Sequence, residues 1–206
     1  VVVSALSGIT DKLYETAKLV AQGESYETAF NEIAEKHYNI ITAAISTEKH
    51  DFVKQQINIL LDELQNIFKG VFLIKDISDR IIDTIVSYGE RLSSLIISNV
   101  IENAVWADST QFIKTNPQFA EEKKCIVCGG FISSDKQSGN ITNLGRGGSD
   151  YTAAIIAATL NASVLEIWTD VDGFMTADPK VINTAYVIER LSFIEAMELC
   201  NFGAKV

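Results

Sequence analysis

The chain has 206 residues, a formal net charge of −10, 47% hydrophobic residues and 21% charged residues. A chain of this length buries roughly 70% of the surface it exposes when unfolded, so we expect a hydrophobic core that needs no disulfides. The 27 acidic residues outnumber the 17 basic ones, and no Lys/Arg cluster occurs, which excludes a nucleic-acid-binding surface. Three cysteines indicate a reducing compartment rather than a disulfide scaffold.

The hydropathy pattern also argues against a membrane protein. The longest apolar stretch, around Leu92 to Val100, is interrupted by serine and asparagine and is well short of the roughly 20 residues that span a bilayer. The first residues, Val1 to Ser4, lack the basic region and apolar segment of a signal peptide. We therefore expect a cytoplasmic protein that has no membrane partner.

The first half of the chain is predicted to be mostly helical. A continuous apolar run, Val1 to Val3, is typical of a buried parallel strand. After it, apolar residues recur three and four positions apart in segments bounded by cap residues or glycine. The predicted helices run from Thr10 to Gly23, from Ser25 to Ala44, from about Asp51 to Lys69 with Gly70 behind, from Ser78 to Ile85, and past Gly89 to Val100.

The second half alternates strands and helices. The predicted strands are Ala104–Asp108, Lys124–Phe131, Asn140–Leu144 and Val164–Trp168, and the polar turn Ser133–Gly139 makes a hairpin of the middle two. The predicted helices run from Tyr151 to about Leu160 and, opened by the capping box Ser192 to Glu195, on to about Asn201. This order indicates an α/β layered fold that binds ligands at the carboxyl ends of its strands.

One connection is too short for this fold. Two parallel strands of one sheet need a crossover of a dozen or more residues, usually a helix. The segment between Asp108 and Lys124 contains Pro117 and has no helical periodicity. The crossover is therefore predicted to be truncated.

The turn from Leu144 to Asp150 carries the strongest chemical signal. Its sequence is Leu-Gly-Arg-Gly-Gly-Ser-Asp, between a predicted strand and a predicted helix. Glycines let a backbone approach a ligand, a helix N-terminus favours anions, and Arg146 adds a fork suited to carboxylate or phosphate. The turn is neither a P-loop nor a dinucleotide fingerprint. The alternative is a plain glycine-rich turn with a solvated arginine.

Two further polar segments have functional and structural interpretations. Asp170, Asp172 and Asp178 could hold a hard cation or shape a nucleotide pocket, but by themselves are better explained as an acidic surface loop. At Tyr88-Gly-Glu-Arg91, a bend at Gly89 would present Glu90 into a cleft. The alternative is a kink with an exposed Glu90–Arg91 ion pair, which contributes little stability.

The cysteines and histidines give little indication of a catalytic or metal-binding site. Cys125 and Cys128 lie in a predicted strand, where positions three apart face opposite sides, so we expect buried free thiols and neither zinc nor redox chemistry. His37 lies on an apolar helix stripe and is predicted to be a core or rim residue, and His50 lies in a predicted loop. A histidine-based nucleophile system is weakly supported.

Six blocks, in order along the whole chain, resemble aspartokinase. They are Val1–Thr10, Tyr88–Glu90, Leu144–Ala154, Glu166–Gly173, Ala177–Pro179, and Glu195–Leu199 with Phe202–Val206. The helical insert after Thr10 and the Glu-Ala-Met-Glu-Leu block are most similar to the bifunctional aspartokinase–homoserine dehydrogenases.

The resemblance implies an amino-acid-kinase fold, a three-layer α/β/α sandwich with a mainly parallel central sheet. It also implies phosphoryl transfer from MgATP to the side-chain carboxylate of L-aspartate, which gives 4-phospho-L-aspartate for lysine, threonine and methionine synthesis. The partners implied are aspartate and ATP, with Mg²⁺ carried by ATP and no direct protein ligand, and a homo-oligomer in the full-length protein.

The resemblance also assigns residues to roles. The catalytic group is Lys205, Asp150 and Arg146. The residues expected to contact aspartate are Thr10, Glu90, Arg146, Gly147, Gly148 and Ser149. The residues expected to contact the nucleotide are Ser4, Gly8, Thr169, Asp170, Phe174, Lys180, Lys205 and Val206.

This sequence also differs from the aspartokinase pattern at particular residues and segments. Phe174 stands where many relatives have Tyr, and Lys180 where many have Arg. Relatives have an opening strand with a Lys-Phe-Gly-Gly turn whose lysine contacts the phosphates, a helix between Phe112 and Cys125, and a C-terminal continuation with ACT domains. We therefore expect residues 1–206 to be an incomplete kinase domain, lacking these parts and a segment near 116–124.

Two alternatives to the aspartate kinase remain open. One is a non-catalytic fragment that binds aspartate or nucleotide without transferring phosphate, which the absence of the phosphate lysine favours for the chain as written. The other is a sister amino-acid kinase that acts on glutamate.

Overall fold

The structure is a computed structural model that describes residues 1–109, 125–135, 137–145, 147–178 and 180–201. The chain divides into two compact units, Val1–Ser163 and Val164–Val206, each of which has its own arrangement of elements. Among the described residues, no helix is both long enough and apolar enough to cross a membrane.

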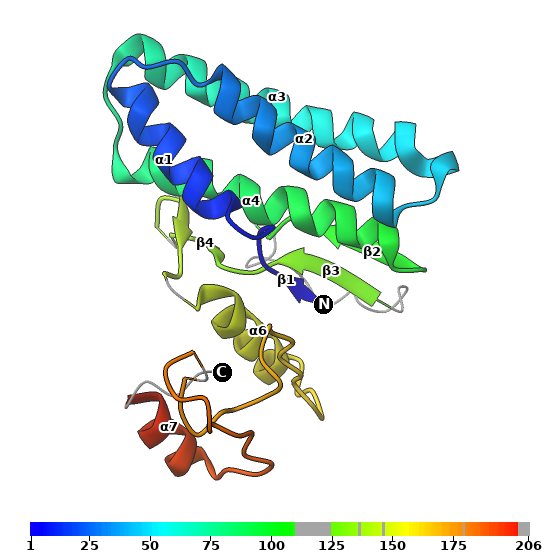
Figure 1. Ribbon diagram of the computed structural model, residues 1–206. Coiled ribbons are helices and arrows are strands. Elements are labelled where there is room, and N and C mark those ends of the chain that lie inside the picture. The colour runs from blue at the N-terminus through cyan, green and yellow to red at the C-terminus, as the bar shows by residue number, and fades with distance from the viewer. Residues whose placement is uncertain (110–124, 136, 146, 179, 202–206) are drawn as a thin grey trace. The chain divides into compact units, whose positions relative to one another are not determined.

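Four helices form the upper layer of the first unit (Figure 1). They are α1 (Ile9–Ala21), α2 (Glu27–Ala44), α3 (His50–Ile74) and α4 (Asp79–Val100), with a short 3₁₀ turn at Thr47–Lys49 between α2 and α3. The helices bury the apolar stripes that the sequence predicts, including Leu13, Ile57 and Leu92. At one end of this core the rings of Tyr26 and Phe68 stack, 5.5 Å between centroids.

Helix boundaries agree with the predictions at Ser78, whose hydroxyl accepts a hydrogen bond from the Ile81 N–H at 3.4 Å and so caps α4. The predicted stop at Gly70 is wrong, because α3 continues to Ile74 and ends where Lys75 adopts a left-handed conformation with φ of 56°. The predicted break at Gly89 is also wrong, because α4 is continuous through it.

A three-stranded parallel sheet lies below α4. It contains β1 (Val2–Val3), β2 (Ala104–Ala107) and β3 (Cys125–Gly129), in the order β1-β3-β2. Val2 pairs with Cys128, and Ala104 pairs with Cys125, both in parallel register. The parallel arrangement confirms the prediction, and the prediction of a truncated crossover concerns residues 110–124, which lie outside the described residues.

The predicted hairpin exists but uses a different first strand. The predicted strand Lys124–Phe131 ends at Gly129, and the chain turns at Phe131, which has φ of 64°. A separate strand, β4 (Ile132–Ser134), then pairs antiparallel with β5 (Ile141–Asn143). The prediction merged two strands because the apolar run continues across the turn without a polar residue.

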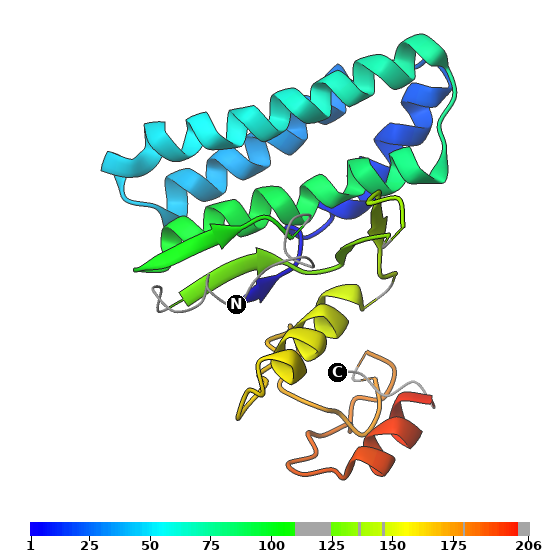
Figure 2. The same ribbon diagram turned by 180° about the vertical axis from the view of Figure 1, so that it is seen from behind.

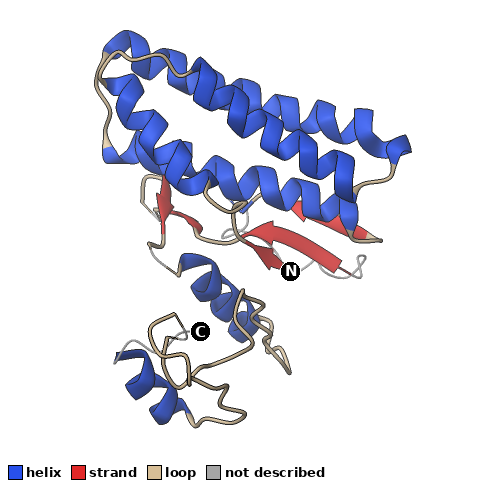
Figure 3. Cartoon of the chain, in the orientation of Figure 1, coloured by secondary structure: helices blue, strands red, loops and turns tan. Residues whose placement is uncertain are grey.

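Helix α6 (Gly148–Thr159) follows the hairpin and lies on the side of the sheet away from α4 (Figures 2 and 3). The first unit therefore has a helical layer, a parallel sheet and a second helical layer, which is the α/β/α architecture expected from the sequence. This layering places the carboxyl ends of β1 and β3 beside the beginning of α6.

The second unit contains α7 (Phe193–Asn201). The predicted capping box is confirmed, since the Ser192 N–H donates to Glu195 Oε2 at 2.7 Å and the Glu195 N–H donates to Ser192 Oγ at 3.3 Å. The predicted strand Val164–Trp168 is wrong, because these residues belong to no helix or strand and Trp168 is 89% exposed. An apolar run reports a tendency to be buried, whereas a strand also needs a hydrogen-bonding neighbour.

Candidate functional site

A cavity of about 350 Å³ opens in the first unit between the loop after β1 and the beginning of α6. Its lining combines residues from both ends of the unit's sequence with one from α4. The lining residues are Ser4, Ala5, Leu6, Ser7, Gly8, Thr10, Asp11, Glu90, Phe131, Gly145, Gly147, Gly148, Ser149 and Asp150. Eight of the predicted site residues therefore share one cavity: Ser4, Gly8, Thr10, Glu90, Gly147, Gly148, Ser149 and Asp150.

Two helix N-termini face this cavity. Gly8 caps α1 with φ of 74°, and Gly147 caps α6 with φ of 71°. Glycine is required at both positions because a side chain rarely adopts this conformation. A Cβ at either position would have no other atom within 4 Å, so the backbone is open to a ligand. The aligned peptide dipoles at both N-termini favour an anionic ligand group.

Glu90 supplies a buried carboxylate to the same cavity. The residue is only 3% exposed, Oε1 accepts a hydrogen bond from the Ala5 N–H at 3.3 Å, and Oε2 is buried without a partner. Burial raises the pKa of Glu90 to about 7, and the Ala5 N–H opposes part of that rise. A buried carboxylate oxygen without a partner fits an ammonium group of a ligand.

Helix α4 places Glu90 by close approach rather than by a bend. A Cβ at Gly89 would lie 2.8 Å from the Ala5 Cβ, and a Cβ at Gly129 would lie 2.9 Å from the Glu90 Cβ. The Ser93 hydroxyl also donates to the Ser4 carbonyl at 2.7 Å. The loop after β1 therefore packs directly on α4, and both predictions of a bend or kink at Gly89 are corrected.

Arg91 does not pair with Glu90. Its guanidinium lies 3.2 Å from Asp108 Oδ2 and 3.4 Å from Glu63 Oε2, and it stacks over the Tyr88 ring at 4.6 Å. The Tyr88 hydroxyl donates to Glu63 at 3.0 Å, and burial raises the pKa of Tyr88 to about 12. This network joins α3, α4 and the residue after β2, and it leaves Glu90 as a carboxylate without a neighbouring cation among the described residues.

The start of α6 is held by close backbone contacts. A Cβ at Gly130 would lie 2.6 Å from the Ser149 Cα, and a Cβ at Gly148 would lie 3.1 Å from the Phe131 Cα. The Phe131 N–H donates to Thr152 Oγ1 at 3.2 Å. The segment Gly129-Gly-Phe131 therefore fixes the glycine turn of α6, a role that the sequence prediction missed although the paired glycines were its signal.

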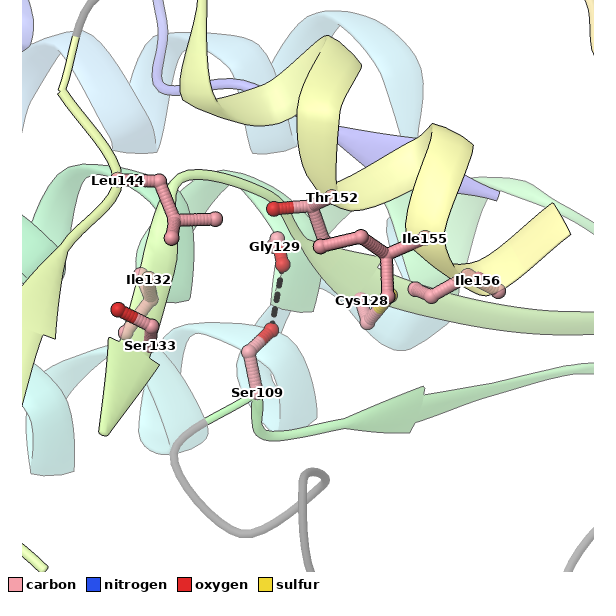
Figure 4. A pocket seen from close by; sticks show the side chains of 9 residues that line it. All are labelled: Ser109, Cys128, Gly129, Ile132, Ser133, Leu144, Thr152, Ile155 and Ile156. Atoms are coloured by element: carbon pink, nitrogen blue, oxygen red, sulfur yellow. Dashed lines mark hydrogen bonds between the residues drawn. The ribbon is translucent and has the colours of Figure 1, made fainter. Parts of the chain in front are cut away.

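A second cavity, of about 110 Å³, lies beside α6 and has an almost entirely apolar lining (Figure 4). Ile132, Ile155 and Cys128 line it, and the Ser109 hydroxyl at its edge donates to the Gly129 carbonyl at 2.5 Å. Burial raises the pKa of the Cys128 thiol, as expected of a structural cysteine. The lining of this cavity contains no charged side chain and therefore differs from that of the cavity at Glu90.

The other predicted site residues lie elsewhere. Arg146, Lys205 and Val206 are outside the described residues. Four nucleotide candidates belong to the second unit: Thr169, Asp170, Phe174 and Lys180.

These four residues make hydrogen bonds to other residues of the second unit. Thr169 Oγ1 donates to Asp170 Oδ1 at 3.3 Å, and the Lys180 N–H donates to Asp178 Oδ1 at 2.9 Å. The Phe174 carbonyl accepts from the Ile188 N–H at 2.8 Å.

The structure also bears on metal binding. In the described part of the chain, no group of three or more His, Cys, Asp or Glu side chains could hold a metal ion. Asp170 and Asp172 are exposed, which agrees with the acidic-surface-loop interpretation of that segment. Cys125 and Cys128 are free thiols, as predicted, but only Cys128 is buried, and Cys125 is partly exposed.

The first unit is thus a layered α/β protein in which two glycine-capped helix N-termini and a buried carboxylate line one cavity. The amino acid kinase family matches residues 1–206, and the chain belongs to this family.

Two relatives show which members of the family this chain is similar to in sequence. Lysine-sensitive aspartokinase 3 of Escherichia coli is 32% identical, and the match covers 100% of this chain and 50% of that protein. The bifunctional aspartokinase/homoserine dehydrogenase of Buchnera aphidicola is 34% identical over 87% of this chain and 24% of that protein. The chain thus spans between a quarter and a half of the length of these relatives.

Solved structures agree with this assignment. E. coli aspartokinase III in complex with aspartate and ADP superimposes with a TM-score of 0.84 at 30% identity, covering 98% of this chain and 49% of that one. The aspartate kinase of Clostridium acetobutylicum gives a TM-score of 0.69 at 27% identity, covering 96% of this chain and 46% of that one.

Proposed function

We propose that the protein containing this chain is an aspartate kinase that transfers the γ-phosphoryl group of MgATP to the side-chain carboxylate of L-aspartate. The observation that carries the proposal is the pairing, in one cavity, of the buried Glu90 carboxylate with the N-termini of α1 and α6. An amino acid presents an ammonium group and carboxylates, which are the complements of these features. The similarity to aspartokinases supports aspartate as the amino acid.

The proposed substrate contacts follow from the cavity. Glu90 Oε2 binds the ammonium, and the hydroxyls of Thr10 and Ser149, at the glycine turn Gly147-Gly148, bind carboxylate oxygens. Arg146 adds a bidentate contact to a carboxylate. Asp150, on the first turn of α6, orients the groups around the transferring centre. Holding both reactants in place accounts for much of the acceleration in phosphoryl transfer.

The nucleotide contacts are proposed for two sets of residues. The set that lines the cavity is Ser4 and Gly8. The remaining set is Thr169, Asp170, Phe174, Lys180, Lys205 and Val206. Mg²⁺ bound to ATP would neutralise the charge of the phosphates, and Lys205 would stabilise the charge that develops on the transferring group.

The product of this reaction is 4-phospho-L-aspartate, a precursor for lysine, threonine and methionine. We propose further that residues 1–206 are part of an amino-acid kinase catalytic domain from a cytoplasmic homo-oligomer with ACT domains. The E. coli alignment extends over 231 positions, more than the 206 residues of this chain, which supports internal segments in the relatives without a counterpart here. A bifunctional parent protein is proposed on the helical insert after Thr10 and the Glu195–Leu199 block.

A coupled assay of ADP release tests the proposal on the full-length protein, with aspartate and glutamate as alternative acceptors. The expected result is turnover with aspartate and little with glutamate. Turnover with glutamate alone would assign a sister amino-acid kinase, and no turnover with either, combined with saturable aspartate binding by calorimetry, would assign a non-catalytic binding protein.

Two substitutions separate the proposed roles. Arg146→Ala should mainly raise the KM for aspartate, because it removes a substrate contact, whereas Lys205→Ala should mainly lower kcat. Lys18→Ala, on the outer face of α1, is the matched control and should change neither. The opposite pattern would show that the two roles are exchanged.

A further inference from the structure

We propose that Gly89 is a positioning residue: its missing side chain lets the loop Ser4–Gly8 sit directly on α4, and this contact sets the position of the loop relative to Glu90. The inference rests on the proposed function and adds a residue that touches neither substrate nor nucleotide. It concerns the way in which the cavity is held in shape rather than the groups that line it.

Helix α4 contains a glycine that its backbone conformation does not require. Gly89 lies in the interior of α4 with ordinary helical backbone, where glycine is roughly 0.5–1 kcal/mol less favourable than alanine. A Cβ at this position would lie 2.8 Å from the Ala5 Cβ, 3.5 Å from Ile9 Cγ2 and 3.6 Å from Leu13 Cδ1. Two of these are ordinary contacts, so the Ala5 methyl group alone requires glycine.

Gly70 provides the contrast. It also lies inside a helix, α3, but a Cβ there would have no other atom within 4 Å. The absence of a side chain therefore has a packing reason at Gly89 and none at Gly70.

The loop is fixed to α4 at three points. The Ser4 carbonyl accepts from the Ser93 hydroxyl at 2.7 Å, the Ala5 N–H donates to Glu90 Oε1 at 3.3 Å, and the Ala5 methyl group rests against Gly89. At 3.3 Å the Ala5–Glu90 hydrogen bond is already longer than is usual for an N–H···O bond, so a small outward movement of Ala5 would break it first.

Movement of Ala5 would change the positions or contacts of residues on both sides of the proposed site. The loop ends at Gly8, the cap of α1, and Thr10 follows on the first turn, so both would move with it. Glu90 would lose its hydrogen bond from the Ala5 N–H, and with it a contribution that keeps the pKa of Glu90 from rising further. The other carboxylates that line the cavity, Asp11 and Asp150, are exposed and lie on other elements.

The test compares Gly89→Ala with Gly70→Ala in the full-length enzyme. Gly89→Ala should lower kcat/KM for aspartate by about tenfold to a hundredfold, because misplacement by a fraction of an ångström to an ångström is enough for such a loss. The acidic limb of its pH profile should shift to higher pH, because ionised Glu90 binds the ammonium and its pKa has risen. Gly70→Ala should leave kcat/KM and the pH profile unchanged.

Removal of the obstructing methyl group provides the rescue. The double variant Gly89→Ala/Ala5→Gly should recover most of the lost kcat/KM and return the acidic limb toward its original position. If Gly89→Ala does not fold, Ala5→Val tests the same contact from the loop side and should produce the same alkaline shift. Wild-type kinetics in Gly89→Ala, or a loss that Ala5→Gly does not rescue, would overturn the inference.

Failure of the inference can be distinguished from failure of the proposed function. If the wild-type protein does not turn over aspartate, the function is wrong, yet the contact remains testable by thermal unfolding of the two single variants and the double variant. The contact predicts that their effects are not additive, since the double variant lacks the clash. Additive effects would show that Ala5 and Gly89 do not interact.

Discussion

The apolar interior of α1 to α4 and the cavity at the edge of the sheet are built on opposite principles. In the interior, side chains such as Phe68 and Leu64 are fully buried against other apolar groups. At the cavity, Glu90 is almost as deeply buried but keeps an unpartnered oxygen, and glycines replace side chains at Gly8 and Gly147. The interior is arranged for stability, whereas the cavity keeps groups ready for a ligand at the expense of stability.

This comparison predicts the largest loss of stability in the interior. Phe68→Ala should lower the free energy of unfolding by about 3–5 kcal/mol, because it leaves a void beside Tyr26. Urea unfolding followed by circular dichroism measures the change. Phe52→Ala, an exposed phenylalanine at the start of the same helix, is the control and should change it by less than about 0.5 kcal/mol.

At the cavity, the opposite sign is expected. A carboxyl group whose pKa is raised to about 7 in the folded state from an ordinary 4.5 destabilises the fold progressively as pH rises through this window. Glu90→Gln should therefore unfold at a higher urea concentration than the wild type at pH 8, by up to about 3 kcal/mol, and differ little at pH 4. It should also lose aspartate turnover.

The exposed Glu15→Gln is the matched control for Glu90→Gln and should change neither property. A Glu90→Gln variant that is less stable than the wild type at pH 8 would show that the carboxylate is satisfied within the fold, contrary to its unpartnered oxygen.

The apolar interior also contains a buried polar side chain with an unpartnered atom, that of His37. It is fully buried, Nδ1 lies 2.7 Å from the Ile33 carbonyl, and Nε2 has no partner. Burial lowers the pKa of His37 below its ordinary 6.5, so the unfolded chain binds the proton first and stability falls as pH falls below 6.5. His37→Leu should reduce the loss of melting temperature between pH 7 and pH 5.

The partly exposed His50 provides the comparison for that measurement, as His50→Leu removes a histidine from the same helical layer. An equal pH dependence in wild type and His37→Leu would show that His37 does not contribute to acid destabilisation.

The smallest effect is expected on the surface, outside both regions. Lys12 and Glu32 form an exposed ion pair between α1 and α2. Lys12→Ala should change the free energy of unfolding by less than about 1 kcal/mol, since solvent screens such pairs. A loss comparable to that of Phe68→Ala would show that surface charge, rather than the apolar interior, holds these helices together.

The sequence determined much of the fold because its signals are local. Apolar spacing located α1 to α3 and the two halves of α4, the Ser78 cap and the Ser192 capping box marked helix starts, and the glycine-rich turn before α6 was recognised from its residues alone. Eight predicted site residues share one cavity because the loop after β1, helix α4 and the first turn of α6 meet there.

Only the tertiary structure decided the role of particular residues whose surroundings come from distant parts of the chain. Gly89 suggested a bend, but the Ala5 methyl group, from the beginning of the chain, explains it as a close contact inside a continuous helix. Arg91 suggested an ion pair with its neighbour, yet it faces Glu63 and Asp108 because adjacent helix positions point in different directions. Sequence spacing determines which residues share a face, and the fold alone determines what that face meets.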